Sequence, residues 1–279
     1  MPQIEELIEK ALDEDMPAGD VTTDSLVPAH RKGKASFLAK AEGILAGIEI
    51  AKSVFLKVDP FLKFSVLKQD GAPIKPGDIL ATVEGDVAGI LKAERTSLNF
   101  LQHLSGIATA TSQYVQAVKG LPVKILDTRK TVPGLRVLEK YAVAMGGGQN
   151  HRLNLSDMVL IKDNHIAILR EQGLSISDIV RKARSNAAKR IKIEIETTNA
   201  KDALEAASAG ADLVMLDNMD PDSMKEAVKL LNHKAIVEAS GGVTLDTVRS
   251  IAKTGVDWIS VGAVTHSAKA LDISLEIET

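Results

Sequence analysis

Apolar and polar positions follow two different rhythms along the chain. Before about residue 92, apolar residues spaced three or four positions apart over residues 3–14 and 48–58 predict two amphipathic helices. Strand-like runs, separated by turn sequences such as KPGD at 75–78, cover residues 35–39, 61–67, 79–83 and 87–91. Helices and strands that do not alternate regularly indicate an α+β domain.

A long helical pattern over residues 93–119 leads into the second half of the chain, with an expected break at Ser105 and Gly106. After it, six short apolar runs recur, each followed by a helical stretch. The runs occupy residues 123–126, 158–161, 191–196, 213–216, 235–239 and 258–261. This alternation predicts a parallel sheet whose right-handed crossovers favour a barrel.

We therefore assign the chain to the α/β class, with two domains. Residues 1–108 are predicted to form an N-terminal α+β domain with the connector helix, and residues 109–279 an α/β-barrel catalytic domain. For the last ~15 residues two placements stay open: they can stay with the barrel domain, or the chain can return and pack them on the N-terminal domain.

Each apolar run of the second half ends at residues that can do chemistry. In a barrel the carboxyl ends of all strands share one face, so clusters that are far apart in the sequence meet in one site. The cations near the first two run ends are Arg129, Lys130, His151, Arg152 and Lys162. Most Lys and Arg side chains are ordinary solvated surface. Here several directly follow strand-like runs, where a rigid scaffold holds them, and their convergence predicts an anion site.

Small residues after the last two runs predict a phosphate site. Ser240, Gly241 and Gly242 precede a helix that begins near Thr244, and Gly262 precedes another short helix. Glycine lets backbone N–H groups approach an anion at a helix N-terminus, and the loops after the last strands are the phosphate position of barrel enzymes. A pair of glycines is also a common turn, so both interpretations stay open.

Two acidic residues, Glu196 and Asp217, end neighbouring runs. Two carboxylates can bind Mg²⁺ together with substrate oxygens, or they can cap the helices that follow. His266 lies beside the second glycine loop, and the residues alone leave its role undecided.

Composition narrows the function classes. A net charge of −3, a pI near 6.1 and 3% aromatic residues argue against an extended nucleic-acid surface. The absence of cysteine excludes disulfides, thiol catalysis and thiolate metal sites. No apolar run approaches the ~20 residues of a membrane span, and the first residues are acidic and amphipathic rather than a signal peptide. We expect a cytoplasmic protein with no nucleic-acid or membrane partner.

Six longer motifs resemble those of quinolinate phosphoribosyltransferases, also called nicotinate-nucleotide pyrophosphorylases (carboxylating). They are ERTSLNFLQHLSGIAT at 94–109, DTRKTVPGLRVLEKYAV at 127–143, GGGQNHR at 146–152, LIKDNH at 160–165, MLDN at 215–218 and EASGG at 238–242. The similarity runs almost from end to end. It implies transfer of phosphoribosyl from phosphoribosyl pyrophosphate to quinolinate with decarboxylation, giving nicotinate mononucleotide, pyrophosphate and CO₂ in NAD biosynthesis.

The resemblance also implies a fold and an assembly. The barrel would be incomplete and seven-stranded, of the type II phosphoribosyltransferase kind. The chain would form a homodimer with active sites at the interface, and a hexamer is a further assembly to consider. Arg95 matches an arginine that reaches into the site from the partner subunit.

Individual site residues are carried over in the same way. Those matching positions around the pyridine dicarboxylate are Arg129, Lys130, His151, Arg152 and Lys162, and those matching the 5′-phosphate loops are Ser240, Gly241, Gly242 and Gly262. Glu196 and Asp217 match acids near the ribose and the Mg²⁺ of phosphoribosyl pyrophosphate. The predicted cofactor is thus Mg²⁺, held by these two acids with substrate oxygens and water. The predicted catalytic residues are Lys130, Lys162, Glu196 and Asp217.

Three other functions stay open from the sequence. A nicotinate phosphoribosyltransferase would share the barrel and the phosphate loops but would need fewer cations for its single carboxylate. A class I aldolase would use Lys162 as a Schiff-base amine. A non-catalytic protein that binds a phosphosugar would release no pyrophosphate.

Overall fold

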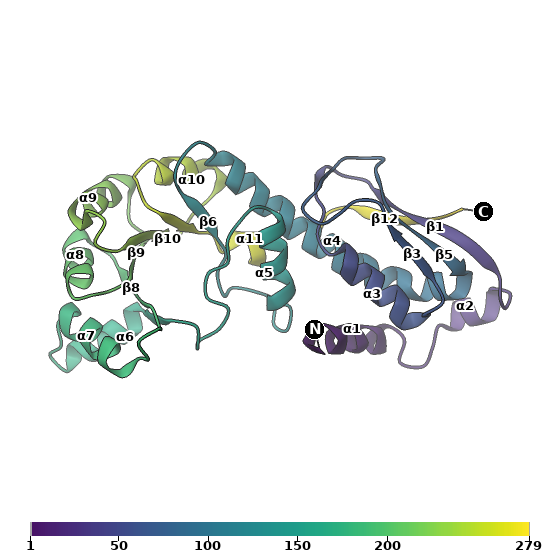
Figure 1. Cartoon of the computed structure of the whole chain (residues 1–279), viewed down its shortest axis with the longest axis horizontal. Helices are drawn as coiled ribbons and strands as arrows, with labels where there is room; N and C mark the ends of the chain where they lie inside the picture. The colour runs from purple at the N-terminus through teal and green to yellow at the C-terminus, as the bar shows by residue number, and fades with distance from the viewer. Residues whose placement is uncertain (1, 279) are drawn as a thin grey trace. The chain divides into compact units, whose positions relative to one another are not determined.

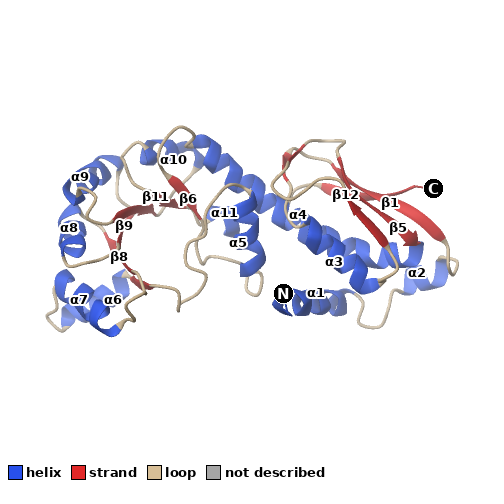
Figure 2. Ribbon diagram, in the orientation of Figure 1, coloured by secondary structure: helices blue, strands red, loops and turns tan. Residues whose placement is uncertain are grey.

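The computed structural model describes residues 2–278, and the chain divides into two compact units. The first unit contains the residues up to Ser112, the segment Val132–Gly147 and the residues from Ala268 on. The second contains Gln113–Thr131 and Gly148–Ser267. Each unit has its own sheet, drawn in red in Figure 2.

The first unit is built on a four-stranded antiparallel sheet in the order β12-β1-β5-β3. Its strands are β1 (Lys32–Ala39), β3 (Lys63–Val66), β5 (Ile79–Asp86) and β12 (Ile273–Glu278), and a small pair is formed by β2 (Gly43–Ile44) and β4 (Pro73–Ile74). Its first helices are α1 (Pro2–Asp15), α2 (Val21–Leu26) and α3 (Ile48–Val58). Phe37 of β1, Phe55 of α3 and Phe64 of β3 place their ring centroids 5.6 to 5.7 Å apart, which fixes the helix on the sheet.

The helix α4 (Val87–Ala117) corrects two expectations. The stretch 87–91 is helical rather than a strand, because it is the start of one long helix, and the Asp86 carboxylate supports that start by accepting the Ala88 N–H at 3.1 Å. The helix also continues through Ser105 and Gly106. A Cβ on Gly106 would lie 2.1 Å from the Lys269 carbonyl oxygen, so the glycine permits close contact with the C-terminal segment and does not break the helix.

The second unit is a curved parallel sheet in the order β6-β11-β10-β9-β8-β7. Its strands are β6 (Lys124–Leu126), β7 (Val159–Ile161), β8 (Ile193–Thr197), β9 (Leu213–Asp217), β10 (Ile236–Ser240) and β11 (Trp258–Ser260). All six apolar runs are therefore strands, as predicted. Most of their residues are apolar because both faces of a parallel sheet are covered, and the exceptions inside the strands include Glu194 of β8 and Glu238 of β10.

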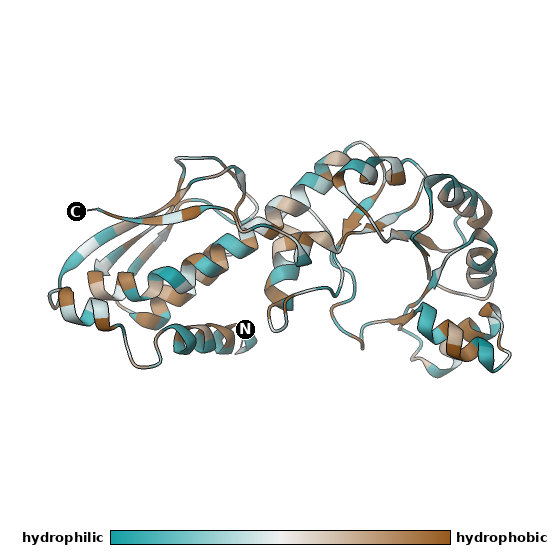
Figure 3. Cartoon of the chain, turned by 180° about the vertical axis from the view of Figure 1, so that it is seen from behind, coloured by the Kyte–Doolittle hydropathy of each residue, from teal (hydrophilic) through white to brown (hydrophobic). Residues whose placement is uncertain are grey.

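Helices lie along the outer side of this curved sheet (Figure 1). They are α6 (Asp163–Glu171), α7 (Ile176–Asn186), α8 (Ala200–Ser208), α9 (Pro221–Leu231) and α10 (Leu245–Ala252). The short α11 (Ala263–His266) follows β11, and α5 (Arg136–Met145) belongs to the first unit. Figure 3 shows apolar and polar stripes on the same helices, as the helical spacing predicts. Among residues 2–278, no helix combines the length and the apolar content that a bilayer span requires.

The barrel is incomplete, as expected. The two end strands of the sheet are β6 and β7, and one residue of a further chain segment, Gln149, forms a parallel bridge with Leu126 of β6. Gln149 donates its N–H to the Ile125 oxygen at 2.8 Å and accepts the Asp127 N–H at 3.1 Å. A single bridged residue thus occupies the place of a seventh strand, and it positions His151 and Arg152 next to the end of β6.

Candidate active site

A cavity of about 800 Å³ lies at the carboxyl ends of the strands of the second unit. Among its lining residues are Arg129, Lys130, His151, Arg152, Lys162, Glu196, Asp217, Ser240, Gly241, Gly242, Gly262 and His266. The structure therefore brings together every site residue expected from the sequence except one. Arg95, which is exposed on α4 in the first unit, does not line this cavity.

The two arginines of the cavity are crowded together. Burial, followed by the charge of Arg129, lowers the pKa of the Arg152 guanidinium. The Nε of Arg129 is buried and donates no hydrogen bond within the described part of the chain. Like charges held close and incompletely hydrogen-bonded are favourable only when an anion joins them, so this corner of the cavity is suited to carboxylates.

Lys162 and Glu196 contact each other directly. The Lys162 Nζ lies 2.8 Å from Glu196 Oε1, and the second carboxylate oxygen accepts the Asp163 N–H at 3.4 Å. Lys162 is the N-cap of α6, and its own N–H donates to His165 Nδ1 at 2.9 Å. The sequence suggested separate roles for Lys162 and Glu196, whereas the structure shows them as an ion pair.

Asp217 is linked to the glycine loop through Asn218. Asn218 has a left-handed backbone (φ 52°), donates its N–H to the Ser240 oxygen at 2.9 Å, and donates from its amide to Asp217 Oδ2 at 3.0 Å. Its amide also fills the space beside Gly241, where a Cβ would lie 2.3 Å from the Asn218 Oδ1. Gly241 itself has φ 93°, so both its backbone and its surroundings require glycine.

Lys130 lies beside the second glycine loop. Its carbonyl oxygen accepts the Thr265 hydroxyl at 2.8 Å, and its side chain runs so close to Gly262 that a Cβ there would lie 3.1 Å from Lys130 Cδ. This contact joins the cation cluster to the predicted phosphate loop, which the sequence could not show.

The acids that line the cavity fit a Mg²⁺ ion. Glu196 and Asp217 come from adjacent strands, and both face the cavity. Two carboxylates supplemented by substrate oxygens and water are the usual Mg²⁺ ligands of phosphate-transfer sites. Lys162 occupies Glu196 Oε1, so a metal at Glu196 either uses the other oxygen, Oε2, or competes with the ammonium group.

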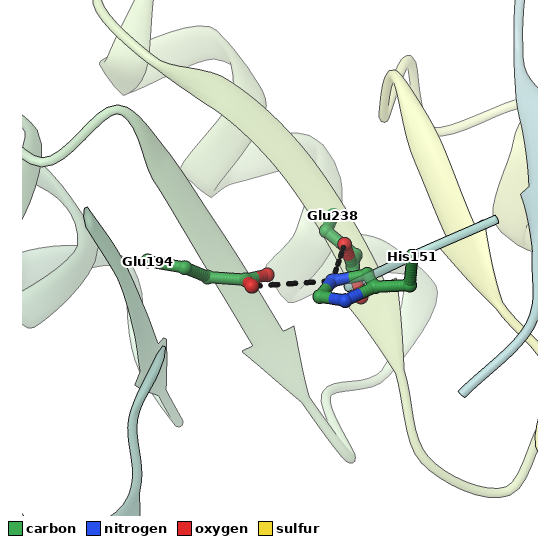
Figure 4. A group of neighbouring side chains, drawn as sticks. All are labelled: His151, Glu194 and Glu238. Carbon is green, nitrogen blue, oxygen red and sulfur yellow. Dashed lines mark ion pairs between the residues drawn. The ribbon is translucent and has the colours of Figure 1, made fainter. Parts of the chain in front are cut away.

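Two functional candidates were missed from the sequence, Glu194 and Glu238. Both are fully buried, and an oxygen of each lies 3.2 Å from the Nε2 of His151, as Figure 4 shows. The distances suit one N–H shared between two acceptors rather than one linear hydrogen bond. The signal was present in the IEIE run, since alternate residues of a barrel strand face its interior and Glu194 is two positions before Glu196.

Burial and the contacts among the three side chains shift the pKa values of Glu194 and His151. Burial, supported by the charge of Glu238, raises the pKa of Glu194 to about 7, although the contact with His151 acts in the opposite direction and lowers it. Burial alone would lower the pKa of His151, but the two carboxylates raise it to about 10. The Nδ1 of His151 nevertheless accepts the Arg152 N–H at 2.9 Å, and a proton on Nδ1 would break that bond. We therefore assign a ring proton to Nε2, where it faces both carboxylates.

Comparison with known proteins supplies the family. The quinolinate phosphoribosyl transferase N-terminal domain matches residues 20–105, and the C-terminal domain of the same family matches residues 107–276. The chain belongs to the quinolinate phosphoribosyltransferase family. This confirms the resemblance that the motifs suggested.

Named relatives agree over nearly the whole length. The chain is 44% identical over 292 residues to quinolinate phosphoribosyltransferase (decarboxylating) 2, mitochondrial, of Nicotiana glauca, covering 99% of the chain and 82% of that protein. It is 44% identical over 288 residues to nicotinate-nucleotide pyrophosphorylase (carboxylating), chloroplastic, of Oryza sativa subsp. japonica, covering 98% and 77%. The solved nicotinate-nucleotide pyrophosphorylase of Francisella tularensis has a TM-score of 0.94 at 38% identity, covering 99% of this chain and 96% of that one.

Proposed function

We propose that the protein transfers phosphoribosyl from phosphoribosyl pyrophosphate to quinolinate with decarboxylation, yielding nicotinate mononucleotide, pyrophosphate and CO₂ for NAD biosynthesis (EC 2.4.2.19). The observation that carries this proposal is the match of both family domains across residues 20–276. The cavity supports it, because cations, acids and glycine loops from all six strands line one space.

Charge complementarity selects the acceptor. Quinolinate carries two adjacent carboxylates, and the crowded Arg129 and Arg152 guanidiniums are relieved by two negative charges. Nicotinate brings only one carboxylate and would leave part of the cluster unmatched. Lys162 can turn from Glu196 to a substrate carboxylate, which frees the acid for the ribose or the metal.

Positioning is the main contribution of the protein to the transfer step. The ring nitrogen of quinolinate attacks C1′ of the ribose while the C1′–O bond to pyrophosphate breaks, so no covalent enzyme intermediate is needed. Backbone N–H groups of Ser240, Gly241 and Gly242 are proposed to hold the 5′-phosphate. Mg²⁺, when bound at Glu196 and Asp217, neutralises charge on the pyrophosphate. Lys130 lies between the cation cluster and the Gly262 loop, where it can contact both substrates.

Decarboxylation uses the ring itself. After ribosylation the positively charged ring nitrogen stabilises the electron pair left at C2 when the C2–carboxylate bond breaks, and a proton then takes its place. The protein has to hold the ring by its other carboxylate while the 2-carboxylate departs as neutral CO₂. A cluster with several cations permits this, since the ion pair with the 2-carboxylate can break while the ion pair with the other carboxylate keeps the ring in place.

The rival functions are weaker on specific observations. An aldolase Schiff base needs a neutral amine, whereas the Lys162 Nζ pairs with a carboxylate at 2.8 Å.

We also propose a homodimer in which Arg95 of the partner completes the site, because Arg95 matches a family position and yet does not line the cavity of the second unit. The cytoplasmic location stays a prediction, since named relatives are mitochondrial and chloroplastic.

The decisive assay follows both products. Purified protein with phosphoribosyl pyrophosphate, Mg²⁺ and quinolinate labelled in the 2-carboxylate should release CO₂ and pyrophosphate in equal amounts. Arg129→Ala should abolish both, while Arg181→Ala, which removes an arginine from the exposed face of α7, should change neither. Pyrophosphate release from nicotinate at a comparable rate would instead identify a nicotinate phosphoribosyltransferase.

A further inference from the structure

Two buried carboxylates lie beneath the cation cluster, and the reaction described above gives them no role. Glu194 is the second residue of β8 and Glu238 is the central residue of β10, and each side chain is fully buried. A buried carboxylate is costly unless it is compensated. Neither oxygen of Glu194 accepts a well-aligned hydrogen bond from any residue in 2–278, while Glu238 accepts one from the Ser260 hydroxyl at 2.6 Å.

Both carboxylates face one ring, that of His151. Figure 4 shows the imidazole between the two glutamates, with its Nε2 edge 3.2 Å from an oxygen of each. On its other edge, Nδ1 accepts the main-chain N–H of Arg152 at 2.9 Å. The main-chain N–H of His151 donates in turn to Asp127 Oδ1 at 2.9 Å. The ring is thus held on both edges, and both nitrogens face protein groups rather than the cavity.

A metal ion does not explain this arrangement. The three side chains are close enough to share one ion. A histidine that binds a metal through Nε2 carries its proton on Nδ1 and donates it to an acceptor. Here Nδ1 is itself the acceptor, because the group facing it is a backbone N–H. The cluster therefore fastens His151 rather than holding an ion.

We propose that Glu194 and Glu238 are positioning residues of the substrate-carboxylate site, acting through His151 on the main chain at Arg152. The inference rests on the proposed function, in which Arg152 binds a carboxylate of quinolinate. It changes the role expected for His151, which becomes the link between the buried acids and Arg152 instead of a direct ligand of the substrate.

The need for such an anchor follows from the charges. Arg129 and Arg152 repel each other, and the hydrogen bond from Arg152 Nη1 to the Met158 oxygen is long, at 3.3 Å, so a main-chain anchor adds to a weak side-chain restraint on Arg152. Its segment has little secondary structure to hold it, since Gln149 makes an isolated bridge and residues 150–152 belong to no strand or helix. A rigid attachment to two interior strands keeps the guanidinium near its working position and lowers the ordering cost of binding.

Isosteric substitutions test the anchor. Glu194→Gln and Glu238→Gln should each raise the quinolinate Kd and KM by about tenfold, with kcat at saturating quinolinate and the KM for phosphoribosyl pyrophosphate within about threefold of the parent. The double variant should be close to the weaker single variant, because both acids act through one ring.

Asp257→Asn is the matched control for a general loss of stability. Asp257 accepts the Val237 N–H at 2.8 Å, so it holds the same strand one residue before Glu238, and its side chain lies outside the cavity. The control should lower the melting temperature and leave the quinolinate KM unchanged. If the two Gln variants behave like Asp257→Asn, with lower melting temperatures and unchanged quinolinate binding, the acids are only structural and the proposal is overturned.

A spectroscopic measurement separates an anchor from a ligand. The chain has six histidines, and the ring ¹⁵N signals of His151 can be assigned by their loss in His151→Gln. Adding quinolinate should leave them nearly unchanged, whereas a large shift of either ring nitrogen would make His151 a direct ligand and refute the proposal.

Arg152→Lys distinguishes failure of this inference from failure of the proposed function. If Arg152→Lys binds quinolinate more weakly while both Gln variants bind it normally, the positioning role of Glu194 and Glu238 is refuted and the carboxylate site at Arg152 stands. Normal binding in Arg152→Lys would remove the carboxylate site on which the anchor depends.

Discussion

Replacing Gly241 with alanine tests how tightly the phosphate loop is built. The new Cβ would lie 2.3 Å from Asn218 Oδ1 and 2.5 Å from its Cγ, whereas ordinary contact begins at 3.4 Å. Either the loop or the Asn218 amide must therefore move by about 1 Å. The φ of 93° adds ~1–2 kcal/mol of backbone strain for any residue with a Cβ.

A displacement of this size at a substrate-positioning group costs roughly 10²-fold in rate. We expect kcat/KM for phosphoribosyl pyrophosphate to fall about a hundredfold in Gly241→Ala, with the quinolinate Kd unchanged because the cation cluster is not touched. The measurement is steady-state pyrophosphate release at varied phosphoribosyl pyrophosphate, with calorimetry for quinolinate.

Removing the obstructing amide provides the internal control. Asn218 has φ 52°, which glycine adopts without strain, so Asn218→Gly deletes the side chain and preserves the backbone. The double variant Gly241→Ala with Asn218→Gly should be more active than Gly241→Ala alone. A single variant within threefold of the parent, or a double variant with no recovery, would refute the argument.

Three further outcomes are expected. The kcat/KM for quinolinate should exceed that for nicotinate by about a hundredfold, the lower end of the ~3–5 kcal/mol cost of leaving a buried charge partner unmatched; comparable values would end the dicarboxylate assignment. Arg95→Ala and Lys162→Ala, each inactive alone, should regain up to about a quarter of parental activity when subunits are mixed, since half the dimers then carry one intact site; no recovery despite proven exchange would place Arg95 in its own chain. Asp217→Asn should lower kcat roughly 10²-fold and raise the Mg²⁺ requirement without weakening quinolinate binding, and a collapse of quinolinate affinity by calorimetry would contradict the metal and ribose role.

Local patterns were sufficient for most of the architecture. The six parallel strands could be predicted because each is a short, mainly apolar run that stops at polar or small residues. The stretch 87–91 was assigned wrongly because a short apolar run is compatible with either a strand or a helix. In the structure it is the start of the 31-residue helix α4, where the Ala88 N–H donates to the Asp86 carboxylate.

By itself the sequence determined the six parallel strands, the motifs of the family, and most of the cations, acids and glycines that line the cavity, since these depend on residues close together in the chain. Only the tertiary structure decided which of them touch. Lys162 with Glu196, and His151 with Glu194 and Glu238, are contacts between strands or segments that no local pattern relates. Chain folding alone sets such distances, because residues at the interior of a curved sheet meet across it whatever their separation in sequence.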